Sequence, residues 1–201
     1  MTRTALRIGL FCVVGWVLTG IPLGGAAAVP VAYGTPTSFK VTVKNCQLSA
    51  DGGSTWTTIW TTGIEMDVAT VSKGDEALKF VQNFSIPFGT YNKMRYTVDA
   101  VMKITGSITY SGSTYYTSTS AVNDPTSGPA VEYTFTNPSG DTSYTNDVSV
   151  VVQNAKITYA RISFNIDQGA ALYLAGAGIY KILPNQVTPS VTVNAPAAPM
   201  P

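Results

Sequence analysis

Residues 94–104 read MRYTVDAVMKI, and this stretch decides the fold class. Its even positions, from Met94 to Ile104, are all apolar, while its odd positions include Arg95 and Lys103. Side chains of a β-strand alternate between two faces, so six apolar residues at every second position predict a long strand. One face of that strand should be buried and the other solvated, which is typical of antiparallel sheets.

The strand is preceded by a Pro-x-Gly-x-Tyr corner, residues 87–91. Pro87 cannot donate a ladder hydrogen bond, and Gly89 supplies a flexible turn position. We expect Tyr91 to pack its ring and to direct its hydroxyl to the backbone of the corner. Turn chemistry explains these residue types, so we interpret the corner as structural.

Upstream, residues 39–48 also alternate, but their apolar phase slips at Asn45. A single slip of this kind predicts a β-bulge, because one extra residue inverts the alternation. The Asp-Gly-Gly sequence at 51–53 favours a turn, and 56–62 has the composition of a strand. The sequence therefore predicts a bulged hairpin.

Downstream, Ser111-Gly112 predicts the turn of a second hairpin, and 138–147 has the composition of a loop. Residues 75–82 fit either one or two helical turns or an extended chain. Further strands are expected at 131–137, 148–154, 156–167 and 170–183. Many short strands separated by turn signals predict an antiparallel β-sandwich or barrel.

The first 28 residues have the pattern of a secretory signal peptide. Arg3 and Arg7 precede an apolar run over 8–23, and three alanines ending at Ala28 offer a cleavage site. The alternative is an uncleaved anchor, since about 20 apolar residues can span a bilayer. We predict cleavage after Ala28 and a protein that is secreted to the cell exterior or cell surface.

The charge of the mature chain is nearly balanced. Ten Lys and Arg would remain after cleavage against eleven Asp and Glu, so a nucleic-acid partner is not expected. Histidine is absent, which excludes Ser-His-Asp and Cys-His catalysis and leaves no zinc ligand set. We expect no cofactor. Cys46 would be the single mature cysteine, either bridging two copies or lying buried as a small apolar side chain.

The C-terminal residues 184–201 hold five prolines and no charge. They predict an extended Pro-rich tail outside the core, with no membrane span. Within it Val187, Val191 and Val193 occupy alternate positions. These valines are candidate assembly residues, because such a segment could also lie along an open sheet edge of the same chain or of a neighbour. Pairing with a neighbour would produce a filament.

The order of several motifs resembles a family of exported bacterial domains of unknown function. They are the Ser-x-Asp-Gly-Gly turn at 49–53, Met-Asp-Val at 66–68, the corner at 87–91 and Phe-x-Ile-Asp at 164–167, followed by a strand ending at Leu-Pro. The resemblance implies a prealbumin-like or carboxypeptidase-regulatory-like (carbohydrate-binding-like) β-sandwich and brings no catalytic residues.

The predicted architecture is a single all-β domain. We expect an antiparallel β-sandwich, prealbumin-like or immunoglobulin-like, with extended termini. Its parts are a signal peptide at 1–28, an irregular lead-in at 29–37, the sandwich at 38–183 and the tail at 184–201.

Aromatic side chains are the candidate ligand-binding residues, because flat rings on a sheet face can stack on sugars. Trp56 and Trp60 lie four apart on one face of the expected strand, and three tyrosines flank the second hairpin: Tyr110, Tyr115 and Tyr116. The alternative is that these rings belong to the core. Calcium has only weak candidates, Asp141, Asn146 and Asp147, without the spacing of a known calcium loop.

Two functions follow, in different classes. The first is a non-enzymatic, secreted or cell-surface module with a structural, adhesive or filament-forming role, whose partner is another copy or a surface polysaccharide. The alternative is a carbohydrate-binding module that uses surface Trp and Tyr. A carboxylate-dependent enzyme is a third possibility, but no two acidic residues stand out as partners.

Overall fold

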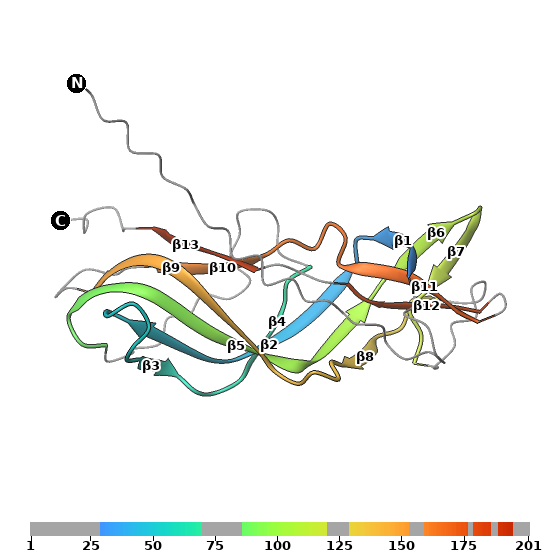
Figure 1. Cartoon of the computed structure of the whole chain (residues 1–201). Helices are drawn as coiled ribbons and strands as arrows, with labels where there is room; N and C mark the ends of the chain where they lie inside the picture. The colour runs from blue at the N-terminus through green and yellow to red at the C-terminus, as the bar shows by residue number, and fades with distance from the viewer. Residues whose placement is uncertain are drawn as a thin grey trace, which may run out of the picture.

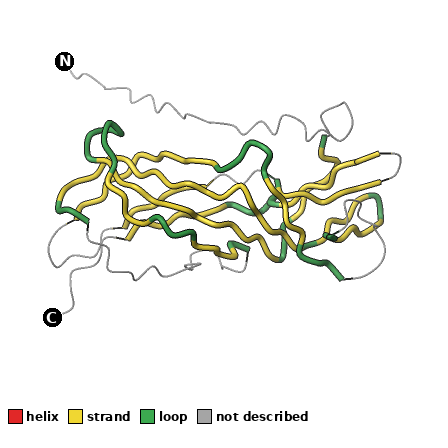
Figure 2. Tube along the Cα trace, turned by 90° about the horizontal axis from the view of Figure 1, so that it is seen from below, coloured by secondary structure: helices red, strands yellow, loops and turns green. Residues whose placement is uncertain are grey.

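The computed structural model describes residues 29–69, 86–119, 129–152, 159–176, 179–185 and 189–194. The regular elements of these described residues are all strands, and every strand pairing is antiparallel (Figure 2). This confirms the all-β antiparallel class. Accordingly, none of the described residues belongs to a helix that could cross a membrane. The expected signal peptide and the segment 75–82 lie outside the described residues.

Two long strands run the length of the molecule (Figure 1). β2 (Ser38–Ser49) pairs with β5 (Gly89–Thr105), which at about 3.3 Å per residue extends roughly 55 Å. The predicted alternation is confirmed. Met94, Tyr96 and Ile104 are buried, while Arg95 and Lys103 are not.

Four shorter strands flank this pair in one six-stranded sheet. On the β2 side, β3 pairs with the C-terminal half of β2 and β4 with its N-terminal half. On the β5 side, β9 pairs with the N-terminal half of β5 and β8 with its C-terminal half. Their bounds are Thr57–Trp60 for β3, Ile64–Asp67 for β4, Tyr133–Thr136 for β8 and Thr142–Val152 for β9.

The flanking strands change partners where β2 and β5 are irregular. The predicted bulge near Asn45 is confirmed, because Val43 pairs with Val98 while Asn45 pairs with Thr97, which leaves an extra residue in β2. A second irregularity sets residues 99–101 of β5 opposite the single residue Thr42 of β2, so β5 holds two extra residues there. β9 pairs with β5 up to Val98, and β8 takes over from Val101.

Carboxylates satisfy the backbone of the β5 bulge. Ala100 donates its N–H to Asp141 Oδ1 (2.9 Å), and Val101 donates to Asp99 Oδ1 (2.8 Å). Lys44 Nζ lies 3.0 Å from Asp99 Oδ2 and 2.9 Å from Asp141 Oδ2. The bulge therefore keeps its amides hydrogen-bonded although they leave the regular ladder.

The inner face of the sheet is covered by smaller groups of strands (Figure 1). One is the pair of β10 and β13, another the three-stranded sheet β1-β11-β12, and the third the hairpin of β6 and β7. Their bounds are β1 Pro30–Gly34, β6 Ser107–Tyr110, β7 Ser113–Tyr116, β10 Tyr159–Phe164, β11 Ala170–Gly176, β12 Ile179–Pro184 and β13 Pro189–Asn194.

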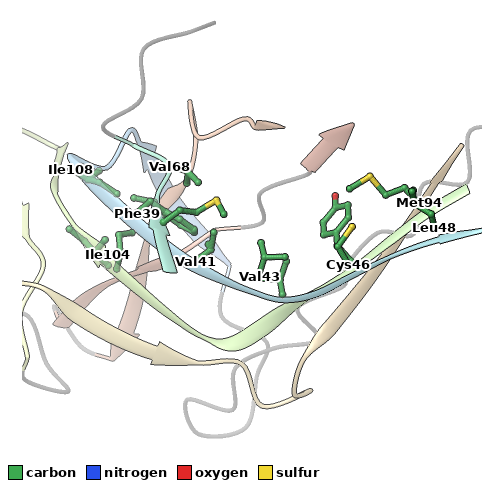
Figure 3. Close-up of a cluster of buried hydrophobic side chains, with 14 of the residues drawn as sticks. Phe39, Val41, Val43, Cys46, Leu48, Val68, Met94, Ile104 and Ile108 are labelled. Carbon is green, nitrogen blue, oxygen red and sulfur yellow. The ribbon is translucent and has the colours of Figure 1, made fainter. Parts of the chain in front are cut away.

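The main core lies between these layers. The inward side chains of β2 line it from Phe39 through Val43 to Leu48, together with Ile104 of β5 and Ile108 of β6 (Figure 3). Each fully buried large apolar side chain contributes about 2 kcal/mol. A smaller cluster on the other face of β11 consists of Phe135, Ala171, Tyr173 and Leu183.

Cys46 belongs to the main core and is fully buried. Burial raises the pKa of its thiol to about 12, so the group stays protonated. Of the two interpretations of this cysteine, the structure supports the buried apolar one.

The structure also bears on the local turns. The hairpin around Ser111 and Gly112 is confirmed, with φ of 49° and 79° at these two residues, as a tight hairpin turn requires. The Tyr91 hydroxyl donates to the Pro87 carbonyl at 2.8 Å and the ring is buried, as expected for the corner.

Several boundaries differ from the sequence expectations. Residues 142–147 were expected in a loop but form the start of β9, because Tyr144 stacks on Tyr96 across the pair with β5. The segment 170–183 is a hairpin, β11 and β12, rather than one strand. Residues 30–34 of the lead-in and 189–194 of the tail are strands, since β11 and β10 offer them open edges.

The bulge predicts a pH-dependent contribution to stability. Hydrogen bonds from Lys44 and from the Ala100 amide lower the pKa of Asp141 below its usual 3.8. A depressed carboxyl pKa adds stability above the unfolded-state pKa, and this is lost as the pH falls through the folded-state pKa. We expect Asp141→Asn to reduce the melting temperature at neutral pH, and the difference from wild type to shrink on acidification.

Thermal melts between about pH 7 and about pH 3 measure this difference. Asp147→Asn is the matched control, because Asp147 also pairs with a lysine but is 85% exposed and accepts no hydrogen bond from a backbone amide of the described residues. An equal, pH-independent loss in both variants would contradict the role of Asp141.

Candidate functional site

The outer face of the six-stranded sheet carries one continuous row of polar side chains. Gln47 pairs in register with Thr58 on one side and with Arg95 on the other, and Arg95 pairs with Thr145. Because paired residues share a face, the row crosses β3, β2, β5 and β9. We call these four residues the outer row.

A tight turn places Trp56 beside the outer row. Gly52 and Gly53 have φ of 75° and 102°, which other residues rarely adopt. Asp51 accepts hydrogen bonds from the Thr55 hydroxyl (2.7 Å) and the Thr55 amide (2.9 Å), and these bonds hold the pKa of Asp51 well below its usual value. A Cβ at Gly53 would lie 3.3 Å from Cζ2 of Trp56, so the indole packs closely against this glycine.

Arg95 is held between Trp56 and Gln47. Its Cζ lies 4.2 Å from the centroid of the Trp56 ring, within cation–π range. Arg95 Nε and Nη2 both donate to Gln47 Oε1, at 2.9 and 2.6 Å, and Gln47 Nε2 donates to the Thr58 hydroxyl at 3.1 Å. The guanidinium thus has one fixed orientation.

The lysines of the outer face have acidic partners on neighbouring strands. The pairs are Lys40 with Glu132, Lys44 with Asp99 and Asp141, Lys93 with Asp147, and Lys103 with Glu65. The hydrogen bond to Glu132 raises the pKa of Lys40, and the bond to Asp141 raises that of Lys44. These pairs favour the charged forms of their members.

The expectation that Trp56 and Trp60 share a face is wrong. Gln47 pairs with Thr58 and Cys46 with Trp60, so Ile59 is an extra residue that inverts the alternation of β3. Trp60 consequently packs against the main core, in one cross-strand row with Cys46 and Tyr96. Trp56 remains half-buried on the outer side.

The three hairpin tyrosines do not form one exposed platform. Tyr115 is only 6% exposed and its ring centroid lies 4.7 Å from that of Tyr180 on β12. Tyr110 lies 5.9 Å from the same ring. Tyr116 follows Tyr115 directly in β7 and therefore points to the opposite face of the hairpin.

The calcium candidates are separated by the structure. Asp141 pairs with Lys44, whereas Asp147 pairs with Lys93 on the outer face. Asn146 lies between them in the inward phase of β9. No group of three or more acidic or cysteine side chains is suitably placed for a metal ion in the described part of the chain.

Two of the candidate assembly residues lie in β13. Val191 pairs with Ile162 and Val193 with Ala160 of β10 in the same chain, and Val191 also packs against the main core. Val187 lies outside the described residues. Pro189 is the first residue of β13, where its missing N–H is tolerated.

Sequence reasoning missed Arg95 and Gln47 as candidate site residues. Both were visible as outward positions of alternating strands, but the contact of Arg95 with Trp56 joins separate segments and follows from the register of β2 with β3 and β5. Comparisons with protein families, with curated proteins and with solved structures found no match for this chain.

The different positions of the two tryptophans predict different fluorescence quenching. In protein that lacks residues 1–28, and with them Trp16, we expect the Trp60→Phe variant, which keeps Trp56, to be quenched more strongly than Trp56→Phe. Iodide should quench Trp56 better than caesium does, because the Arg95 cation attracts the anion. Stern–Volmer plots of both variants test this, and a Trp60 that is quenched as readily as Trp56 would contradict the assignment.

Proposed function

We propose that the chain is an exported, non-enzymatic β-module that acts by contact at the cell surface, with a structural or adhesive role. The observation that carries this proposal is the outer face, an open sheet surface of cross-strand ion pairs and hydroxyls with Trp56 and Arg95 fixed among them. Such a surface suits recognition of an extended polymer or another protein.

Three carboxylates of the described residues have structural roles. Asp51, Asp67 and Asp141 have lowered pKa values, which keeps these carboxylates ionised. A carboxylate-dependent hydrolase instead needs one carboxyl group with a raised pKa that can donate a proton. Each of the three acids accepts hydrogen bonds that stabilise a turn, a strand end or a bulge.

The proposed fold and compartment rest on the sequence. We propose a prealbumin-like or immunoglobulin-like sandwich of the exported bacterial family that the motifs resemble, entering the export pathway through residues 1–28. The antiparallel layers on both sides of the main core support a sandwich arrangement. The Tyr91 bond to the Pro87 carbonyl supports the structural interpretation of the shared corner.

Carbohydrate binding is the second candidate function, and Trp56 favours it. Its indole is half-buried against Arg95, and the outer row that contains Arg95 also carries the hydroxyl groups of Thr58 and Thr145. Indole rings supply stacking area, and neighbouring hydroxyls supply hydrogen bonds to sugar hydroxyls. Filament formation would require another sheet edge or an exchange of β13, since β13 pairs with β10 within the chain.

Cosedimentation with insoluble envelope polysaccharide from the producing cells tests the proposal. We expect wild type to sediment with the polysaccharide, Trp56→Ala to remain largely in solution, and no sugar to be released. Tyr33→Ala is the matched control, because Tyr33 is 48% exposed but lies on β1, away from the outer row. Turnover of the polysaccharide that is lost on mutation of a single carboxylate would contradict the proposal.

A further inference from the structure

Arg95 differs from the lysines of the outer face because no carboxylate of the described residues lies at ion-pair distance from its guanidinium. The oxygen that it contacts belongs to Gln47, a neutral acceptor. Among the described cationic side chains, Lys181 shares this property and lies 4.8 Å from the ring of Tyr133. Arg95 therefore carries a positive charge that no acidic side chain of the described residues neutralises.

The orientation of Arg95 leaves one edge of its planar guanidinium group available for a ligand. Gln47 Oε1 occupies the side of Nε and Nη2, and Trp56 covers the guanidinium by ring contact. Within the described part of the chain, Nη1 has no hydrogen-bond acceptor. The Nη1–Nη2 end of the guanidinium, with one N–H from each nitrogen, can therefore donate two parallel hydrogen bonds to a planar anion.

Immobilisation of the guanidinium favours binding. Arginine loses considerable rotamer freedom when it binds a ligand, but contacts with Gln47 and Trp56 restrict Arg95 before any ligand arrives. Gln47 is itself fixed by its bond to Thr58. An anion at this position also meets a partly buried cation, which salt screens less than an exposed lysine.

We propose that Trp56, Arg95 and Gln47 form a binding site for an acidic polysaccharide, in which Arg95 receives the carboxylate of a uronate residue and Trp56 contacts the sugar ring. This proposal rests on the second candidate function and names its ligand class. A polymer fits better than a free anion, because exposed hydroxyls continue along the face at Thr145 and Ser143.

A pair of polymers with the same sugar backbone tests the role of charge. Polygalacturonate carries free carboxylates, and fully methyl-esterified polygalacturonate has the same rings without the charge. We expect isothermal titration to give on the order of tenfold tighter binding to polygalacturonate, since hydrogen bonds to charged groups are the stronger ones. The preference should fall as the salt concentration rises.

Single-residue variants then test which side chain causes the preference for the charged polymer. Arg95→Gln should bind both polymers equally weakly, and Arg95→Lys should keep only part of the preference because the fork is lost. Lys181→Gln is the matched control, as it removes the other cation that lies over an aromatic ring, and it should bind as wild type does. Circular dichroism and thermal melts confirm that each variant is folded.

The outcomes separate the inference from the function on which it rests. Equal binding of wild type to both polymers, lost in Trp56→Ala, would overturn the acidic ligand and leave carbohydrate binding standing. Binding to neither polymer would overturn both. An Arg95→Gln variant that is folded and keeps the wild-type preference would also overturn the assignment of Arg95.

Discussion

The pairing of β2 with β5 is the constraint on which the rest of the structure depends. The two strands are hydrogen-bonded from Ser38 and Thr105 at one end to Ser49 and Lys93 at the other, and every other strand of the six-stranded sheet attaches to one of them. Their inward side chains line the main core along its length (Figure 3). Loss of the β2–β5 pairing would therefore disrupt both the six-stranded sheet and one side of the main core.

Bulges in and beside this pair decide which side chains reach solvent. The irregular stretch 99–101 of β5 marks the exchange of β9 for β8, and Asp141 accepts a hydrogen bond from the Ala100 amide there. Ile59 in β3 has a comparable effect on a smaller scale, since it sends Trp60 inward while Trp56 stays outside. Regular pairing of Thr58, Gln47, Arg95 and Thr145 thus produces the outer row, whereas the irregularity at Ile59 explains why Trp60 lies on the core side.

Alternation predicted the long strand at 94–104 and the bulge at Asn45, and turn residues predicted the two hairpins, because these features are encoded in consecutive residues. Such local patterns were insufficient where a distant partner decides the structure. Residues 142–147 have loop composition but become a strand against β5, and β1 and β13 form only because β11 and β10 are present. The contact between Arg95 and Trp56 joins residues from separate segments, so no local sequence pattern predicts it.

Residue-resolved hydrogen exchange under increasing denaturant tests most directly whether β2 and β5 form one cooperative unit. The structure predicts that backbone amides hydrogen-bonded between these strands exchange last, and that those on both sides of Ala100 converge on the same opening free energy. Two groups of amides with clearly different opening free energies, one on each side of the bulge, would contradict this account.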